Sequence, residues 1–259
     1  MNKLDKIFTQ KQHNILNIFC TAGFPAKDSL FQVLPALQQH GADIIEVGIP
    51  YSDPIADGPV IQQSNMQALA NGMTIELLFE QLNHLKEKMN IPVILMGYLN
   101  PVLQYGIERF CQDAASAGIS GIILPDLPMH EYEHLYKPLF KKHNLHFIFL
   151  ISPQTSEERI KKADKLSSGF LYAVSSSATT GSDNVSGNQE VYFNKIKNMK
   201  LINPILIGFG IKDKYSFDTA NKYAAGAIIG SAFIKAIAHS SDINRDTALF
   251  IQGIKNTTA

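Results

Sequence analysis

The sequence lacks several features that mark special classes of protein. Its 259 residues carry 23 Lys and Arg against 23 Asp and Glu, so no basic excess favours nucleic acid or an anionic membrane. The only cysteines, Cys20 and Cys111, lie far apart, which argues against a disulfide framework and fits a reducing compartment. No apolar stretch approaches the ~20 residues of a membrane span, and the N-terminus does not resemble a signal peptide. We therefore expect a soluble, cytoplasmic protein without a nucleic-acid or membrane partner.

Short apolar runs alternate with helical patterns along the chain. The runs are continuous rather than alternating, which is typical of strands buried on both faces of a parallel sheet. We expect eight of them, at 15–20, 44–47, 93–96, 121–124, 146–151, 170–174, 205–208 and 227–229. No low-complexity segment or linker divides the chain, so residues 1–259 are predicted to form one domain. Eight strand–helix units in this length predict a (β/α)8 TIM barrel, with a doubly wound open sheet as the alternative.

Between the runs, apolar residues recur at helical spacing. Such stripes occupy 30–37, 75–85 and 132–139, and we expect each to pack on the sheet. Thr74 and Ser156 precede two helical segments and are predicted N-caps. In either fold, ligands bind at the carboxyl ends of the strands, so functional residues should follow the apolar runs.

Glu46 lies inside the second apolar run, where an unpaired charge is costly. A buried carboxyl group has a raised pKa, as a general acid or base requires. The loop that follows carries a second carboxylate, Asp57, before Gly58 and Pro59. The alternatives are structural: Glu46 paired with a buried Lys or capping a helix, and Asp57 as a turn residue.

Two later segments suggest an anion site and a lid. The sixth run, which includes Tyr172, leads into a small, polar loop over 175–187 that is long for this connection. Glycines at 208, 210 and 230 close the seventh and eighth runs, where barrels often bind phosphate through backbone amides. Tyr172 taken alone is a core residue, and a single Gly-Phe-Gly is usually a turn.

Residues 130–134, HEYEH, match the H-E-x-x-H zinc-protease pattern. They fall within the stripe of Tyr132, Leu135, Tyr136 and Leu139, which predicts an outer helix of the barrel with the histidines on its solvated face. We therefore expect no metal site here, and zinc hydrolysis is kept as an alternative that metal analysis tests.

Taken together, these segments and several others resemble the tryptophan synthase alpha subunit family. The most specific segment is 45–59, IEVGIPYSDPIADGP, and the others follow in order over nearly the whole chain. These are 21–25 (TAGFP), 96–101 (MGYLNP), 124–128 (LPDLP), 152–155 (SPQT), 180–181 (TG), 208–211 (GFGI) and 230–231 (GS). The resemblance implies a (β/α)8 barrel that cleaves indole-3-glycerol phosphate to indole and glyceraldehyde 3-phosphate.

The resemblance also implies roles for individual residues. Glu46 would be the catalytic acid and base, Asp57 the second carboxylate, and Tyr172 their neighbour. The substrate would be bound by Phe19, Ile61, Leu99, Leu124, Thr180, Gly181, Phe209, Gly210, Gly230 and Ser231. No cofactor is expected in this chain. Pyridoxal phosphate is expected only in the partner, the tryptophan synthase beta subunit, within an α2β2 heterotetramer, with the loops at 52–56 and 100–105 facing that partner.

Other functions stay open at this stage. A regulatory subunit would bind the substrate without turnover, and another phosphosugar barrel, an isomerase or an aldolase, would share the phosphate signatures but not need the Asp57 loop. No Lys clearly ends a strand, which weakens a Schiff-base aldolase.

Overall fold

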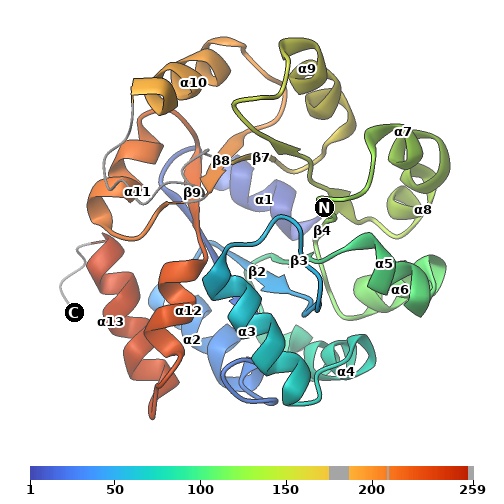
Figure 1. Ribbon diagram of the computed structural model, residues 1–259, viewed down its shortest axis with the longest axis vertical. Coiled ribbons are helices and arrows are strands. Elements are labelled where there is room, and N and C mark those ends of the chain that lie inside the picture. Colours follow the sequence, from blue (N-terminus) through green and yellow to red (C-terminus); the bar gives the residue numbers. More distant parts are fainter. Residues whose placement is uncertain (175–186, 209, 256–259) are drawn as a thin grey trace.

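Parallel strand segments form one curled sheet at the centre of the computed structural model, which describes residues 1–174, 187–208 and 210–255 (Figure 1). The segments are β1 (Ile15–Thr21), β2 (Ile44–Gly48), β3 (Val93–Met96), β4 (Gly121–Ile123), β5 (His146–Phe147), β6 (Leu150–Ile151), β7 (Leu171–Val174), β8 (Ile205–Gly208) and β9 (Gly226–Ile229). Their order across the sheet is β5-β4-β3-β2-β1-β9-β8-β7-β6. Nearly every residue in these segments is buried, as the continuous apolar runs predicted.

The sheet closes into a barrel through its fifth strand. The outermost segments, β5 and β6, are consecutive pieces of chain separated only by Ile148 and Phe149. Ile148 N donates to Ile122 O on one side (3.0 Å), and Tyr172 N donates to Phe149 O on the other (3.1 Å). The predicted strand at 146–151 is therefore two short pieces, because each half pairs with a different neighbour. The predicted (β/α)8 barrel is confirmed with this one modification.

Helices surround the barrel (Figure 1). They are α2 (Leu30–His40), α3 (Pro59–Ala70), α4 (Ile75–Leu85) with the 3-10 turn η1 (Lys86–Lys88), α5 (Leu99–Tyr105), α6 (Ile107–Ser116), α7 (Met129–Glu131), η2 (Tyr132–Tyr136), α8 (Lys137–Lys142), α9 (Glu157–Leu166), α10 (Gly187–Asn198), α11 (Lys214–Asn221), α12 (Ser231–Ile237) and α13 (Ile243–Lys255). The side chains of Thr74 and Ser156 cap α4 and α9, as predicted. Within the described ranges, no helix is both long and apolar enough to cross a membrane.

The predicted stripe over 132–139 is only partly right. Tyr132 is buried and stacks on Phe147 with ring centroids 4.3 Å apart, but Leu135 is 63% exposed. The cause is η2, a π-helical turn whose wider spacing rotates Leu135 away from the sheet. His130 and His134 are exposed here, and the part of the chain that the structure describes contains no cluster of three or more His, Cys, Asp or Glu arranged for a metal.

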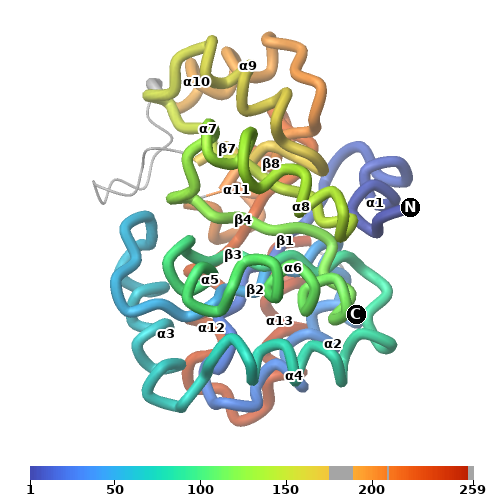
Figure 2. The backbone as a smooth tube through the Cα atoms, turned by 90° about the vertical axis from the view of Figure 1, so that its right-hand side faces the viewer, coloured from blue at the N-terminus to red at the C-terminus, as the bar shows by residue number. Residues whose placement is uncertain are grey.

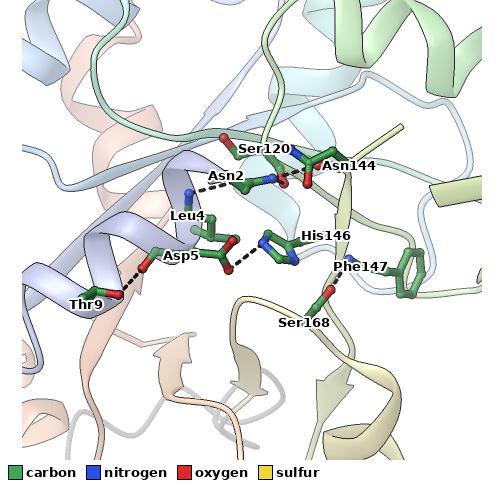
Figure 3. Close-up of polar contacts among 9 residues, drawn as sticks. All are labelled: Asn2, Leu4, Asp5, Thr9, Ser120, Asn144, His146, Phe147 and Ser168. Atoms are coloured by element: carbon green, nitrogen blue, oxygen red, sulfur yellow. Dashed lines mark hydrogen bonds and ion pairs between the residues drawn. The ribbon is translucent and has the colours of Figure 1, made fainter. Parts of the chain in front are cut away.

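A helix that the sequence patterns did not predict, α1 (Lys3–Gln10), covers the N-terminal end of the barrel (Figures 2 and 3). The Asn2 side chain donates from Nδ2 to the carbonyl oxygens of Ser120 and Asn144, both at 2.9 Å, and accepts from Leu4 N at 2.9 Å. Asp5 Oδ1 lies 2.8 Å from Nε2 of His146. These contacts fix α1 below β4 and β5, so the site must open at the opposite end.

Candidate active site

Glu46 is fully buried on β2, where its position pairs with Phe19 of β1. Its Oε2 accepts a hydrogen bond from Asn17 Nδ2 at 2.9 Å, while Oε1 has no hydrogen-bond partner among the described residues. The structural alternatives weighed for Glu46 are thus not observed, because the carboxyl group contacts a neutral amide rather than a lysine or a helix end.

Burial is the largest influence on this carboxyl group and raises the pKa of Glu46 from 4.5 to about 8. The Asn17 hydrogen bond lowers that pKa, and the negative charge of Asp57 raises it. Glu46 therefore exchanges its proton near neutral pH, as a group that alternates between acid and base requires.

Asp57 lies in the loop between β2 and α3 and is partly buried. Burial raises the pKa of its carboxyl group, and hydrogen bonds from Tyr98 and Asn65 lower it. The Asn65 Nδ2 lies 3.5 Å from Asp57 Oδ2, and the Tyr98 hydroxyl also accepts from Ala56 N at 3.0 Å. The Asp57 side chain is thus held by Asn65 of α3 and by Tyr98, which lies between β3 and α5. A residue that only formed a turn would not need these contacts.

Tyr172, on β7, is buried beside both carboxylates. Burial raises the pKa of Tyr172 well above its usual value, and the negative charges of Glu46 and Asp57 raise it further. A Cβ at Gly208 would lie 2.5 Å from the Tyr172 ring, so the ring packs directly on the β8 backbone, where only glycine fits. The structure therefore brings the three predicted catalytic residues into one electrostatic environment.

A cavity of about 450 Å3 opens beside Tyr172. Besides Tyr172, it is lined by Ile61, Gly210, Ile211, Lys212, Ile228, Gly230, Ser231, Ala232, Lys235 and Phe250. Phe19 is adjacent, since a Cβ at Gly230 would lie 3.5 Å from Ile61 and 3.6 Å from Phe19. Five predicted site residues, from α3, from β7 and from the segments that follow β8 and β9, thus border one cavity, and Phe19 lies at its edge.

The remaining predicted residues divide into two groups. Leu99 begins α5 and is fixed by its N–H, which donates to both carboxylate oxygens of Asp126 at 2.9 and 3.0 Å; Leu124 is buried after β4. Neither borders the cavity beside Tyr172. Thr180, Gly181 and Phe209, with most of the predicted lid, lie outside the described residues.

Sequence patterns missed two residues of this site, Asn17 and Tyr98. Asn17 was counted within an apolar run, although a polar residue in such a run, two positions before Phe19, was a signal for a shared inward face. Tyr98 had no such signal, because its contact with the Asp57 loop depends on tertiary structure.

Known proteins match this chain over its length. The sequence model of the tryptophan synthase alpha chain family matches residues 6–257. The chain belongs to this family. The tryptophan synthase alpha chain of Flavobacterium johnsoniae is 52% identical over 232 residues, which cover 89% of this chain and 92% of the relative. That of Christiangramia forsetii is 46% identical over 259 residues and covers 100% of both chains.

Solved structures of this family share the fold. The tryptophan synthase alpha chain from Legionella pneumophila subsp. pneumophila matches with a TM-score of 0.89 at 31% identity, over 99% of this chain and 97% of that chain. A chain of the tryptophan synthase complex from Pyrococcus furiosus matches with a TM-score of 0.87 at 29% identity, over 95% and 100%. The family predicted from the sequence is confirmed, and with it the role of an alpha subunit enzyme in tryptophan biosynthesis.

Proposed function

We propose that this alpha chain cleaves indole-3-glycerol phosphate to indole and glyceraldehyde 3-phosphate, with Glu46, Asp57 and Tyr172 in the catalytic centre. The observation that carries the assignment of residues is the fully buried Glu46, whose pKa of about 8 is influenced by Asp57 across the same site. A neutral acid and a nearby carboxylate are the two groups that this retro-aldol cleavage requires.

The reaction begins with proton transfer to the ring carbon that bears the side chain. Protonated Glu46 donates this proton, and the ring nitrogen becomes iminium-like. Asp57 accepts a hydrogen bond from the ring N–H and stabilises the positive charge that develops there. The Glu46 carboxylate then takes the proton of the adjacent side-chain hydroxyl. The C–C bond breaks, its electrons return to the ring, and an aldehyde forms, so Glu46 ends protonated as it began.

Substrate binding follows from the residues around the cavity. The backbone amides of Gly210, Gly230 and Ser231, with Gly181, are assigned to the phosphate, because close backbone approach and amide donors suit an anion. The indole ring is assigned to the apolar side chains of Phe19, Ile61, Leu99, Leu124 and Phe209, and Thr180 is proposed to bind the substrate with them. Tyr172 orients the substrate beside Glu46.

The partner in this proposal is the tryptophan synthase beta subunit in an α2β2 heterotetramer. Ile55, in the loop between β2 and α3, is 81% exposed beside the exposed Asp53, so this loop offers an apolar contact at the open end of the barrel. Residues 100–105 are not a loop as expected but belong to α5, whose Leu103 is 45% exposed. Pyridoxal phosphate is assigned to the beta subunit alone. We further propose a single domain and a cytoplasmic location, consistent with two free, buried cysteines.

An indole assay tests the function. Purified chain is incubated with indole-3-glycerol phosphate, with and without a beta subunit, and indole and glyceraldehyde 3-phosphate are quantified. We expect the two products in equal amounts, at a rate that the beta subunit increases. Substrate binding without indole in either arm would favour a regulatory subunit. A phosphorylated isomer in place of indole would favour another phosphosugar enzyme, and stoichiometric zinc in the purified chain would reopen the hydrolase.

A further inference from the structure

Asn17 is an unusual residue for its position in the barrel. It is 0% exposed on β1, between Leu16 and Ile18, in a layer where branched apolar side chains normally dominate. A buried amide in such a layer is destabilising unless its polar atoms are hydrogen-bonded. Its Nδ2 donates a hydrogen bond to Glu46 Oε2, but its Oδ1 has no partner among the residues that the structure describes. Packing alone does not account for this residue.

The strand register places Asn17 diagonally below the proposed catalytic carboxyl group. On β1, Asn17 pairs with Ile44 and Phe19 pairs with Glu46, so Asn17 and Glu46 are diagonal neighbours on one face of the sheet. Asn17 lies one layer nearer the N-terminal end of the barrel. Its 2.9 Å hydrogen bond to Oε2 therefore fixes Glu46 from below and leaves Oε1 without a protein partner.

An amide suits a carboxyl group that changes its protonation state. Its N–H donates to an ionised carboxylate, whereas its carbonyl oxygen accepts from a protonated one after the amide rotates. Both amide atoms needed for this exchange are present, one bonded to Glu46 and one without a partner. A lysine at this position would stabilise only the ionised carboxylate. A leucine would form no hydrogen bond with either form.

We propose that Asn17 is a positioning residue that holds Glu46 through Oε2 in both protonation states and keeps Oε1 directed at the substrate. The hydrogen bond stands on geometry alone, while its effect on turnover rests on the proposed function.

Several titratable groups near Glu46 affect the pH at which it loses its proton. They are Asp57 from the following loop, Cys20 on β1 and Tyr172 on β7, while β3 on the other side of β2 is entirely apolar. Burial raises the pKa values of Cys20 and Tyr172, so both stay neutral while Glu46 titrates. Among the described residues, Asp57 is the charged group that raises the pKa of Glu46.

The test is a direct titration of Glu46 in the full chain. Glutamate labelled with 13C at the side-chain carboxyl is incorporated, and the Glu46 resonance is assigned by its loss in Glu46→Gln. Asn17→Leu, which is similar in size but makes no hydrogen bond, removes the partner of both forms of Glu46, and the ionised form loses more because a hydrogen bond to a charged group is stronger. We expect the Glu46 midpoint to rise by about 1 unit, and kcat for indole release to fall about 10-fold or more with KM little changed.

Gln81→Leu is the matched control. Gln81 is also a buried amide, with Nε2 donating to Asp28 at 3.0 Å and Oε1 without a partner among the described residues, but it lies on α4, away from the site. Its replacement should leave the Glu46 midpoint where it is. If Asn17→Leu does not fold, the Asn17 side-chain amide resonances of the wild-type protein serve instead, and they should follow the Glu46 titration and lose this response in Glu46→Gln.

The outcomes separate the two proposals. An unchanged Glu46 midpoint and an unchanged kcat in folded Asn17→Leu, or Asn17 resonances that ignore the Glu46 titration, would overturn the positioning role. A shifted midpoint in a chain that releases no indole would support the hydrogen bond and contradict the proposed function.

Discussion

Two buried side-chain amides, Asn2 below the barrel and Asn17 beside Glu46, differ in how fully they are hydrogen-bonded. At the N-terminal end, Asn2 uses both its donor and its acceptor, with three hydrogen bonds of 2.9 Å (Figure 3). At the other end, Glu46 and Asn17 share one hydrogen bond, and each keeps an oxygen atom without a partner among the described residues. Satisfied groups favour the folded state, whereas unsatisfied ones cost stability and stay available to a ligand. One end therefore serves stability and the other chemistry, as in other barrels of this type.

The largest effect that would test this comparison is on the rate. We expect Glu46→Gln to lower kcat for indole release by about 100- to 10,000-fold, because the amide cannot donate and accept a proton in turn. The exposed Glu87→Gln is the control and should keep the wild-type rate. Circular dichroism must show both variants folded. A Glu46→Gln rate near that of the wild type would remove Glu46 from the mechanism.

At the opposite end, the largest effect is on stability. Leu4 is fully buried beneath the barrel, where a Cβ at Gly169 would lie 2.5 Å from its Cδ2. Leu4→Ala should lower the free energy of unfolding by about 2 to 5 kcal/mol. It should leave kcat and KM close to wild type below the unfolding transition. Urea denaturation with the indole assay measures both, and a kcat loss in fully folded Leu4→Ala would contradict the division between the two ends.

A third prediction concerns the pH dependence of stability. Between pH 4.5, the ordinary pKa, and about 8, the folded chain holds a proton on Glu46 that the unfolded chain has lost, so this group's contribution to stability falls as pH rises. Glu46→Gln does not lose stability in this way, because its side-chain amide does not ionise. Its stability relative to wild type should increase between pH 5 and pH 9 by on the order of 4 kcal/mol. Thermal denaturation at both pH values measures the difference. If the variant and the wild type differed in stability by the same amount at pH 5 and at pH 9, the pKa of Glu46 would be ordinary.

The smallest effect is expected for Asn2→Ala, which removes the cap of α1 and both hydrogen bonds to the barrel. We expect a loss of about 1 to 2 kcal/mol and unchanged kcat. Hydrogen exchange should locate the loss in α1 and the amides around Ser120. Protection that stays as in wild type there would show that α1 is held by its other contacts, such as that of Asp5 with His146.

Much of this fold was predictable because its signals are local. Continuous apolar runs marked the strands, and a charge within one of them marked Glu46. The interruption at Ile148 and Phe149 had no such signal, since it depends on which neighbours the two halves pair with. The π-helical turn that exposes Leu135 is likewise invisible to a pattern with a fixed helical period.

The site shows the same limit. Two carboxylates close in sequence were predictable, but the contact of Tyr98 with the Asp57 loop joins positions 42 residues apart. The break in the apolar run at Asn17 was readable, yet its meaning depends on the register between β1 and β2, which fixes Glu46 as its diagonal neighbour. Side-chain hydrogen bonds between different segments of the fold are therefore what the patterns leave out.

The anchoring of Asn2 has a consequence for biosynthesis. Its two carbonyl partners lie 118 and 142 residues further along the chain. The ribosome therefore completes the first helix long before the groups that secure it exist, and that helix must wait, undocked, while more than half of the protein is translated. The helix that closes the bottom of the barrel therefore docks only once β1 to β4 have been synthesised.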